Sequence, residues 1–339
     1  MTTGALQGLL YCGNILIPSL FPFMVLSAFV VKSGLSDYTG KLLSPVAKKL
    51  FNVSGATGAV ILLGLTGGFP VGAKGIVTLY NQDKISLKTA RQLVMFLVGG
   101  GPGFVVTVVG KCLYNSVTTG LIIWLCQMAV QIILGVFACR NIEYSYKSSQ
   151  QVKAMSISNS LVSSTDSGIN SMMLMCGLVV IFSCIYGICE DIHIINFINT
   201  TLNKIGLPEN ISNSILSVLW EVTKGCNTCS DNACPVWLMA FCLGWGGVCV
   251  HFQIYSICNS LDIPKLKFTA YRFAQGVMSA VLTGVVFNFY KPAITTYSTV
   301  VATVADFTES SAIGSVALIA MCIVFLISVS SNEKGSKIF

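Results

Sequence analysis

The chain has 339 residues, of which 54% are hydrophobic and 10% are charged, and its mean hydropathy is +0.77. Soluble domains carry roughly 25% charged residues, so this composition excludes an ordinary soluble protein and indicates an all-α polytopic membrane protein. The formal net charge of +7 comes mostly from loops between apolar segments, so we expect contact with the lipid bilayer and no nucleic-acid partner.

In chain order, about seven apolar segments are long enough to cross a hydrocarbon core roughly 30 Å thick. They lie at about 8–31, 91–112, 117–139, 168–189, 235–258, 270–290 and 311–331. Two shorter stretches, at about 55–81 and 210–231, are interrupted by glycine or polar residues, which predicts helical hairpins. Tyr38–Phe51 and Ile192–Ile205 place their apolar residues on one helical face, which predicts two helices lying on the membrane surface.

These segments occur twice in the same order, in Phe21–Gly110 and in Leu174–Ser256. Paired repeats with broken helices at matching positions are typical of secondary transporters, whose binding sites lie where the breaks meet. We therefore predict four regions: a first repeat at 5–139, a cytoplasmic linker at 140–167, a second, inverted repeat at 168–290, and an outer loop with a C-terminal transmembrane helix at 291–339.

The basic residues indicate whether the two hairpins cross the membrane or re-enter it. If both cross, the Lys and Arg residues divide 11 to 8 between the two sides, and if both re-enter they divide 15 to 4. Basic residues concentrate in cytoplasmic loops, so re-entrant hairpins are favoured. The N-terminus is then outside, the C-terminus is cytoplasmic, and the hairpin tips meet near the middle of the bilayer. The larger set of basic residues includes Lys84, Lys88 and Arg272.

The first hairpin tip reads LTGGFPVGAK over Leu65–Lys74. Irregular backbone at membrane depth occurs where it is buried in protein or lines a cavity. The N-terminal end of the returning half-helix favours an anion, so we expect a binding site at Thr66, Gly67, Gly68, Pro70 and Gly72. Lys74 lies one turn further on and is either a counter-ion for that substrate or a residue that extends to the interface.

The second hairpin tip contains Glu221, for which three interpretations remain open. The carboxyl group couples transport to H⁺ or Na⁺, forms a buried pair with Lys74, or caps the hairpin. Thr223 and Asn227 offer neutral hydrogen bonds beside it.

The two broken helices supply the other candidate residues. Gly99, Gly101 and Gly103 surround Pro102, a run that is hard to accommodate in an unbroken helix, although small residues also allow close helix packing. In the second repeat, Gly246 and Gly247 are followed by His251 and Gln253, which are either core residues or part of a binding or proton site. We expect no bound cofactor and no metal site, and no catalytic motif argues for an enzyme.

Four motifs in the chain are shared with a known family: PSLFPF at Pro18–Phe23, GFPVGAK at Gly68–Lys74, EVTKG at Glu221–Gly225 and WGGVCVHFQ at Trp245–Gln253. With them the chain resembles the sporulation integral membrane proteins of the YlbJ family, within the nucleoside-recognition Gate superfamily. The resemblance implies a role in endospore formation and movement of dipicolinic acid, a planar dianion, across a cell or forespore membrane. The family usually has one more helix before the first motif, and an Asn-Pro where this chain has Gly101-Pro102.

We therefore expect a multi-pass membrane transporter of a small organic anion, with dipicolinate as the first candidate. A homo-oligomer is one expected assembly of the protein. One alternative is a nucleoside or nucleobase transporter of the same architecture, with Glu221, Thr223, Asn227 and Gln253 as hydrogen-bonding partners. The other is a non-transporting membrane component that assembles with partner proteins during sporulation.

Overall fold

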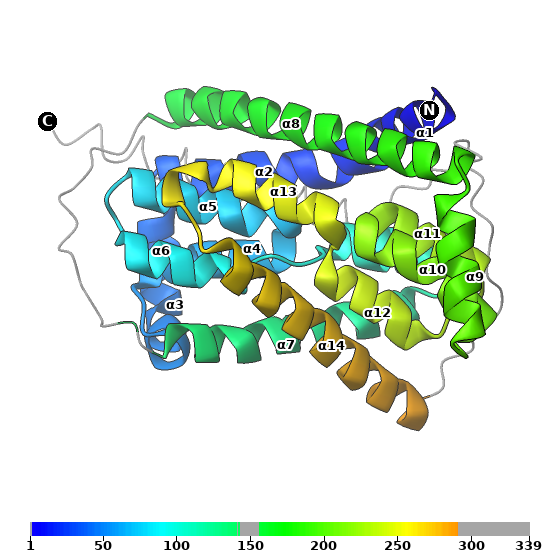
Figure 1. Ribbon diagram of the computed structural model, residues 1–339. Coiled ribbons are helices and arrows are strands. Elements are labelled where there is room, and N and C mark those ends of the chain that lie inside the picture. Colours follow the sequence, from blue (N-terminus) through cyan, green and yellow to red (C-terminus); the bar gives the residue numbers. More distant parts are fainter. Residues whose placement is uncertain (1, 141, 143–155, 291–339) are drawn as a thin grey trace, which may run out of the picture. The chain divides into compact units, whose positions relative to one another are not determined.

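The computed structural model describes residues 2–140, 142 and 156–290, and every regular element in these ranges is helical (Figure 1). The predicted C-terminal helix at 311–331, the outer loop before it and most of the predicted linker lie outside the described residues. The all-helical fold predicted from composition is therefore confirmed for the described part of the chain.

Four helical segments of the described residues are long and apolar enough to cross a membrane. They are α7 (Val117–Cys139), α8 (Ile157–Asp191), the pair α12 (Val236–Trp245) and α13 (Gly247–Ile257), and α14 (Lys265–Phe289). A fifth is added if the N-terminal segment, which bends by 55°, is one span. It consists of α1 (Thr2–Tyr11), the π-helical turn η1 (Cys12–Leu16) and α2 (Ile17–Lys32). The chain is thus a polytopic membrane protein.

The predicted segment at 91–112 is not a continuous helix. It is divided between α6 (Leu87–Val94) and the π-helical η2 (Gly103–Leu113), with irregular backbone from 95 to 101. The interruption falls on the glycine run before Pro102, where flexible backbone and a missing N–H group disfavour a helix.

Serine side chains define where several helices begin. In each case the hydroxyl oxygen accepts a hydrogen bond from the backbone N–H three residues further on, which satisfies one of the free donors in the first helical turn. This cap starts α4 (Gly55–Gly67), α6, α7 and α8, through Ser54, Ser86, Ser116 and Ser156.

The two predicted hairpins are present, as α4 with α5 (Phe69–Asn81) and as α10 (Glu209–Trp220) with α11 (Val222–Asp231). Both are antiparallel. In the first, Gly64 lies against Gly72 and Val60 lies against Gly75. In the second, Gly225 lies against Val218, and the Ser214 hydroxyl donates to the Thr228 carbonyl at 3.4 Å. Each hairpin therefore returns its chain to the end at which it began.

The described elements repeat in the predicted order. Each set consists, in order, of a long helical segment, an amphipathic helix, a hairpin, a broken helix and another long helix. In the first set these are α1–α2, α3 (Leu35–Phe51), α4–α5, α6–η2 and α7. The same sequence returns as α8, α9 (Ile194–Lys204), α10–α11, α12–α13 and α14, with the 3-10 turn η3 (Asn259–Leu261) before α14. The amphipathic helices expose large apolar side chains, including Leu42 and Val46 of α3 and Phe197 of α9.

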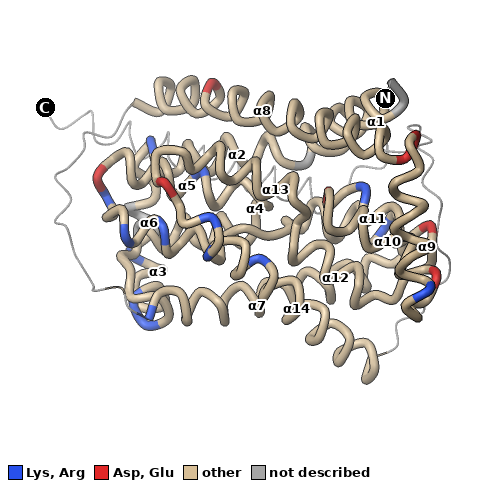
Figure 2. Tube along the Cα trace, in the orientation of Figure 1, with Lys and Arg blue, Asp and Glu red and all other residues tan. Residues whose placement is uncertain are grey.

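Two hydrophobic cores hold the described residues together. The larger one joins the hairpins and broken helices to α7 and α14, and the smaller one joins η1 and α2 to α8. Helix α8 runs along α1 and α2, whereas α14 crosses α12 and α7 (Figure 1). Lys and Arg residues gather around α3 and α6 and again around α9–α11, with few between (Figure 2). The middle of the helical bundle is therefore almost free of charge.

Candidate functional site

In the described part of the chain, the interruptions of the two hairpins and of the two broken helices lie in contact. A β-carbon placed on Gly101 would lie 2.8 Å from the backbone nitrogen of Gly68, and one placed on Gly247 would lie 2.8 Å from the Glu221 α-carbon. A β-carbon placed on Gly246 would lie 3.3 Å from the Phe69 ring. Gly68, Gly246 and Gly247 have φ angles of +100°, +81° and +74°, which glycine adopts without steric penalty.

A small cavity of about 20 Å³ lies at this meeting point. Roughly 10–15 Å³ of such space holds one water molecule, so the cavity has room for a water or a small ion in the conformation described. Its polar lining comes from Glu221, Thr223 and Gln253. The rest of its lining is Leu16, Leu20, Phe69, Gly101, Phe104, Met175, Val179, Val222 and Val250. We call this space the crossing cavity.

Glu221 is the charged group of the crossing cavity, and it is 4% exposed. It separates α10 from α11 in an extended conformation. Its carboxylate oxygens accept hydrogen bonds from the backbone N–H groups of Thr223 at 3.0 Å and Lys224 at 2.8 Å. The carboxylate therefore caps α11, where the partial positive charge of the helix N-terminus stabilises it. Each oxygen has a second lone pair, and the side chain lines the cavity.

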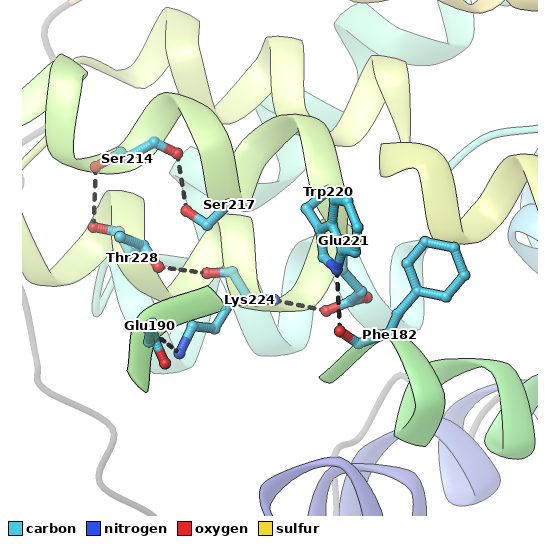
Figure 3. A network of polar contacts seen from close by, with 8 residues as sticks. All are labelled: Phe182, Glu190, Ser214, Ser217, Trp220, Glu221, Lys224 and Thr228. Atoms are coloured by element: carbon cyan, nitrogen blue, oxygen red, sulfur yellow. Dashed lines mark hydrogen bonds and ion pairs between the residues drawn. The ribbon is translucent and has the colours of Figure 1, made fainter. Parts of the chain in front are cut away.

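Two tryptophans hold the second hairpin tip in place. Trp220 donates through Nε1 to the Phe182 carbonyl of α8 at 3.0 Å, and its ring packs against Phe182 (Figure 3). Trp245 donates through Nε1 to the Leu219 carbonyl at 3.0 Å. Leu219 is in the last turn of α10, where carbonyls have no partner within the helix. The tip is thus fixed both to α8 and to the end of α12.

Lys224 points away from the cavity. Its ammonium group lies 3.4 Å from a Glu190 carboxylate oxygen (Figure 3). It also lies 4.9 Å from the centre of the Tyr186 ring, which like Glu190 is on α8. Its charge therefore has a partner outside the crossing cavity.

Lys74 is not among the residues that line the crossing cavity. It lies half-buried on α5, and its charge interacts with that of Lys32 at the end of α2. Among the described residues, no ion pair joins Lys74 to Glu221, whose oxygens are bound by α11 instead. Lys74 follows Phe69 by five residues, which turns it about 140° around a helix with 3.6 residues per turn.

The other predicted residues of the first hairpin are part of its packing. The Thr66 hydroxyl donates to the Leu62 carbonyl of its own helix at 2.9 Å. Gly67 accommodates the Val71 side chain, Gly72 lies against the Leu97 carbonyl, and Pro70 is buried in the first turn of α5. In the second hairpin, Asn227 is half-buried on α11, outside the cavity lining.

The first broken helix is supported from α7. Gly99 leaves space for Gln131, which donates to the Phe96 carbonyl at 3.4 Å, and Gln127 donates to the Ala240 carbonyl of α12 at 3.5 Å. Gly103 begins η2. These contacts position the backbone of Gly101 at the cavity.

His251 and Gln253 diverge although they are two residues apart. The His251 ring, 4% exposed, packs 4.4 Å from the Trp245 ring, and its Nδ1 is 2.8 Å from the Gly247 carbonyl. It belongs to an aromatic cluster behind the second break. Gln253 lines the crossing cavity and donates to the Cys249 sulfur at 3.4 Å.

Two groups of site residues were not identified from the sequence. One apolar wall of the cavity comes from η1, α2 and α8, through Leu16, Leu20, Met175 and Val179. Of these four, the PSLFPF motif contains Leu20. The second is Arg272, which the charge count assigned to the cytoplasmic side. In the structure Arg272 belongs to α14, is 0% exposed and lies against both broken helices.

The comparisons with known proteins agree with this architecture. Residues 15–165 match the Gate family model, described as nucleoside recognition. The chain is therefore a polytopic membrane protein whose residues 15–165 are similar to the Gate nucleoside-recognition domain.

It is a distant homologue of the sporulation integral membrane protein YlbJ of Bacillus subtilis (strain 168). The two are 24% identical over 320 residues, which cover 86% of this chain and 78% of the relative. No solved structure matches the chain.

Proposed function

We propose that this protein is a secondary transporter that binds a small polar organic solute at the crossing cavity. The observation that carries the proposal is the position of Glu221, a buried carboxylate at a hairpin tip in a cavity that both hairpins and both broken helices line. Intramembrane ionisable residues are rare and mark solute or ion pathways. The site holds no arrangement of nucleophile and base that favours catalysis, so we infer transport and not an enzymatic reaction.

The chemistry of the cavity favours a nucleoside or nucleobase. A carboxylate, an amide and a hydroxyl accept and donate hydrogen bonds to neutral polar groups. The apolar walls from η1, α2 and α8 would face a flat ring once the hairpins and broken helices move apart, because at about 20 Å³ the cavity holds only a water or a small ion in the conformation described. Among the described residues, the cavity lining contains no Lys or Arg to balance an anion beside Glu221. We therefore place the nucleoside class ahead of dipicolinate as the solute.

Dipicolinate remains the second candidate because of Lys74 and Lys32. These two lysines lie on neighbouring helices close enough for their charges to interact, and a dianion is the kind of solute that two lysines bind. The homology to a sporulation protein supports a role in spore formation for either solute, in a cell or forespore membrane.

The proposal includes an inverted repeat with re-entrant hairpins. Antiparallel hairpins return the chain to one side, and Lys and Arg residues around α3 and α6 outnumber those around α9–α11 (Figure 2). That asymmetry supports a cytoplasmic location for the first group. Coupling to H⁺ or Na⁺ would act through Glu221, because the cavity has room for a small ion beside it.

Thermal stabilisation of the detergent-purified protein tests the solute class. Uridine at about 100 times its Kd should stabilise the wild type and Lys74→Ala by about 2.7 kcal/mol, and should have no effect on Glu221→Gln. Glu190→Gln is the matched control, because it removes a carboxylate that is half-exposed and paired with Lys224. A dipicolinate shift that disappears in Lys74→Ala, without any uridine shift, would replace the nucleoside proposal with the anion site.

A further inference from the structure

Arg272 is the largest completely buried side chain in the described residues. Its guanidinium group donates hydrogen bonds to the Val98 carbonyl, the Gly244 carbonyl and the Gln275 side-chain oxygen, the last at 2.6 Å. Its Nε lies 3.4 Å from the Trp245 carbonyl. Among the described residues, no Asp or Glu forms an ion pair with it. The charge is therefore balanced by carbonyl dipoles.

The backbone acceptors come from both broken helices. Val98 lies in the irregular stretch between α6 and η2, and Gly244 and Trp245 end α12 just before the break at Gly246. These carbonyls lack helical partners because the helices are interrupted there. Arg272 thus satisfies acceptors that the two breaks expose, and its positive charge lies at the negative end of the α12 dipole.

Arginine is suited to this position in a way that lysine is not. Its planar group presents five donors in fixed directions and stays protonated, so one side chain reaches carbonyls on two different helices. Removing a partner from a buried charge network leaves several groups unsatisfied at once.

The packing of α14 brings the guanidinium to this point. Gly276 lies against Gly244, with a β-carbon on Gly244 placed 2.7 Å from the Gly276 α-carbon. Small residues at such a contact let two helices approach closely. Arg272 lies one turn before Gly276, next to the end of α12.

We propose that Arg272 is a positioning residue that couples the break before Pro102 to the break at Gly246, so that the two breaks open and close as one unit. The residue acts through the backbone of the two breaks and does not line the crossing cavity itself. This inference concerns the mechanics of the fold and holds whichever solute the protein carries.

Hydrogen exchange of the full-length protein in detergent tests the coupling. Arg272→Gln should raise amide exchange in 96–105 and in 242–251 together, by about tenfold or more, because losing a hydrogen bond to a charged group removes roughly 1.5–3 kcal/mol. Arg272→Lys should restore protection partly in one segment, since one ammonium group cannot serve both. Exchange in α3 and α8 should stay at the wild-type level.

Arg91→Lys is the matched control, because Arg91 also donates to a backbone carbonyl, that of Leu261 at 2.7 Å, but is partly exposed. It should leave both segments unchanged. A rise in a single segment, no rise at all, or a uniform rise that includes α3 and α8 would each overturn the proposal.

If Arg272→Gln does not fold, Gln275→Leu replaces it. This variant removes the side-chain acceptor that orients the guanidinium and leaves the charge in place. It should raise exchange in both segments by about threefold, less than Arg272→Gln does, because the guanidinium keeps its hydrogen bonds to the Val98 and Gly244 carbonyls. Unchanged exchange in either segment would contradict the coupling.

Discussion

Gly68, at the tip of the first hairpin, lies directly against Gly101 in the first broken helix, so closely that a β-carbon on Gly101 would be 2.8 Å from the Gly68 nitrogen. This contact joins two chain interruptions that are 33 positions apart and places Gly101 at the crossing cavity. The two backbones can approach this closely because neither glycine has a side chain. The neighbours of Gly101 on the cavity wall include the large apolar side chains of Phe69 and Phe104.

The Gly68–Gly101 contact predicts a steric effect of a single methyl group. Gly101→Ala should destabilise the protein by about 1–3 kcal/mol, as overpacking of a tight contact does. Gly177→Ala is the control, because nothing lies within 4 Å of a β-carbon there and alanine favours the helix. Thermal denaturation in detergent measures both, and equal stability of the two variants would show that the backbones do not touch.

Glu221 has two roles that two substitutions separate. Glu221→Gln keeps one side-chain oxygen for the two N–H groups that the carboxylate caps in α11, so it should lose less stability than Glu221→Ala. Glu221→Ala should lose about 0.5–2 kcal/mol, the usual range for a lost helix cap. Both should abolish the dependence of solute uptake on an H⁺ or Na⁺ gradient. Gradient-dependent uptake by Glu221→Gln in proteoliposomes would remove the carboxylate from ion coupling.

The two tip tryptophans should differ in their contribution to stability. Trp245→Phe leaves the Leu219 carbonyl at the end of α10 without its donor, so we expect a loss of about 1–3 kcal/mol. Trp220→Phe removes a bond to Phe182, whose carbonyl lies within α8 and already accepts a helical hydrogen bond, so the loss should be below about 1 kcal/mol. Denaturation curves decide the order, and a larger effect of Trp220→Phe would contradict it.

The re-entrant hairpin predicts which residues share a side of the membrane. Single cysteines replacing Lys48 in α3 and Lys88 in α6 should react with a membrane-impermeant thiol reagent from the cytoplasmic side, in a background that lacks reactive native cysteines. A cysteine replacing Lys204, at the end of α9, should react from the outside. Labelling of Lys48→Cys and Lys88→Cys from opposite sides would mean that the first hairpin crosses the membrane.

The hairpins were predictable from the sequence because their interruptions are local. Predicted limits of 55–81 and 210–231 compare with Gly55–Asn81 and Glu209–Asp231 in the structure. Glycine, proline and a charged residue within apolar runs disfavour continuous helices wherever the chain folds. The same local signals identified Gly101, Glu221, Thr223 and Gln253, which the structure places together.

Arg272 could not be interpreted from the sequence, because its position at the edge of an uncharged run resembles that of a loop residue. Its burial depends on carbonyls near Val98 and Gly244, which are remote in the chain. The orientation of Lys74 was equally inaccessible, since it depends on which face of α5 meets the rest of the bundle. Both residues show that tertiary contacts decide what an intramembrane charge does.

Uptake of labelled uridine into proteoliposomes is the most direct test of the crossing cavity as the solute site. We predict time-dependent uptake by the wild type that excess unlabelled uridine abolishes and dipicolinate does not, with Glu221→Gln at the level of empty liposomes. Wild-type uptake by Glu221→Gln, or uptake of dipicolinate without uridine, would contradict the assignment of the crossing cavity.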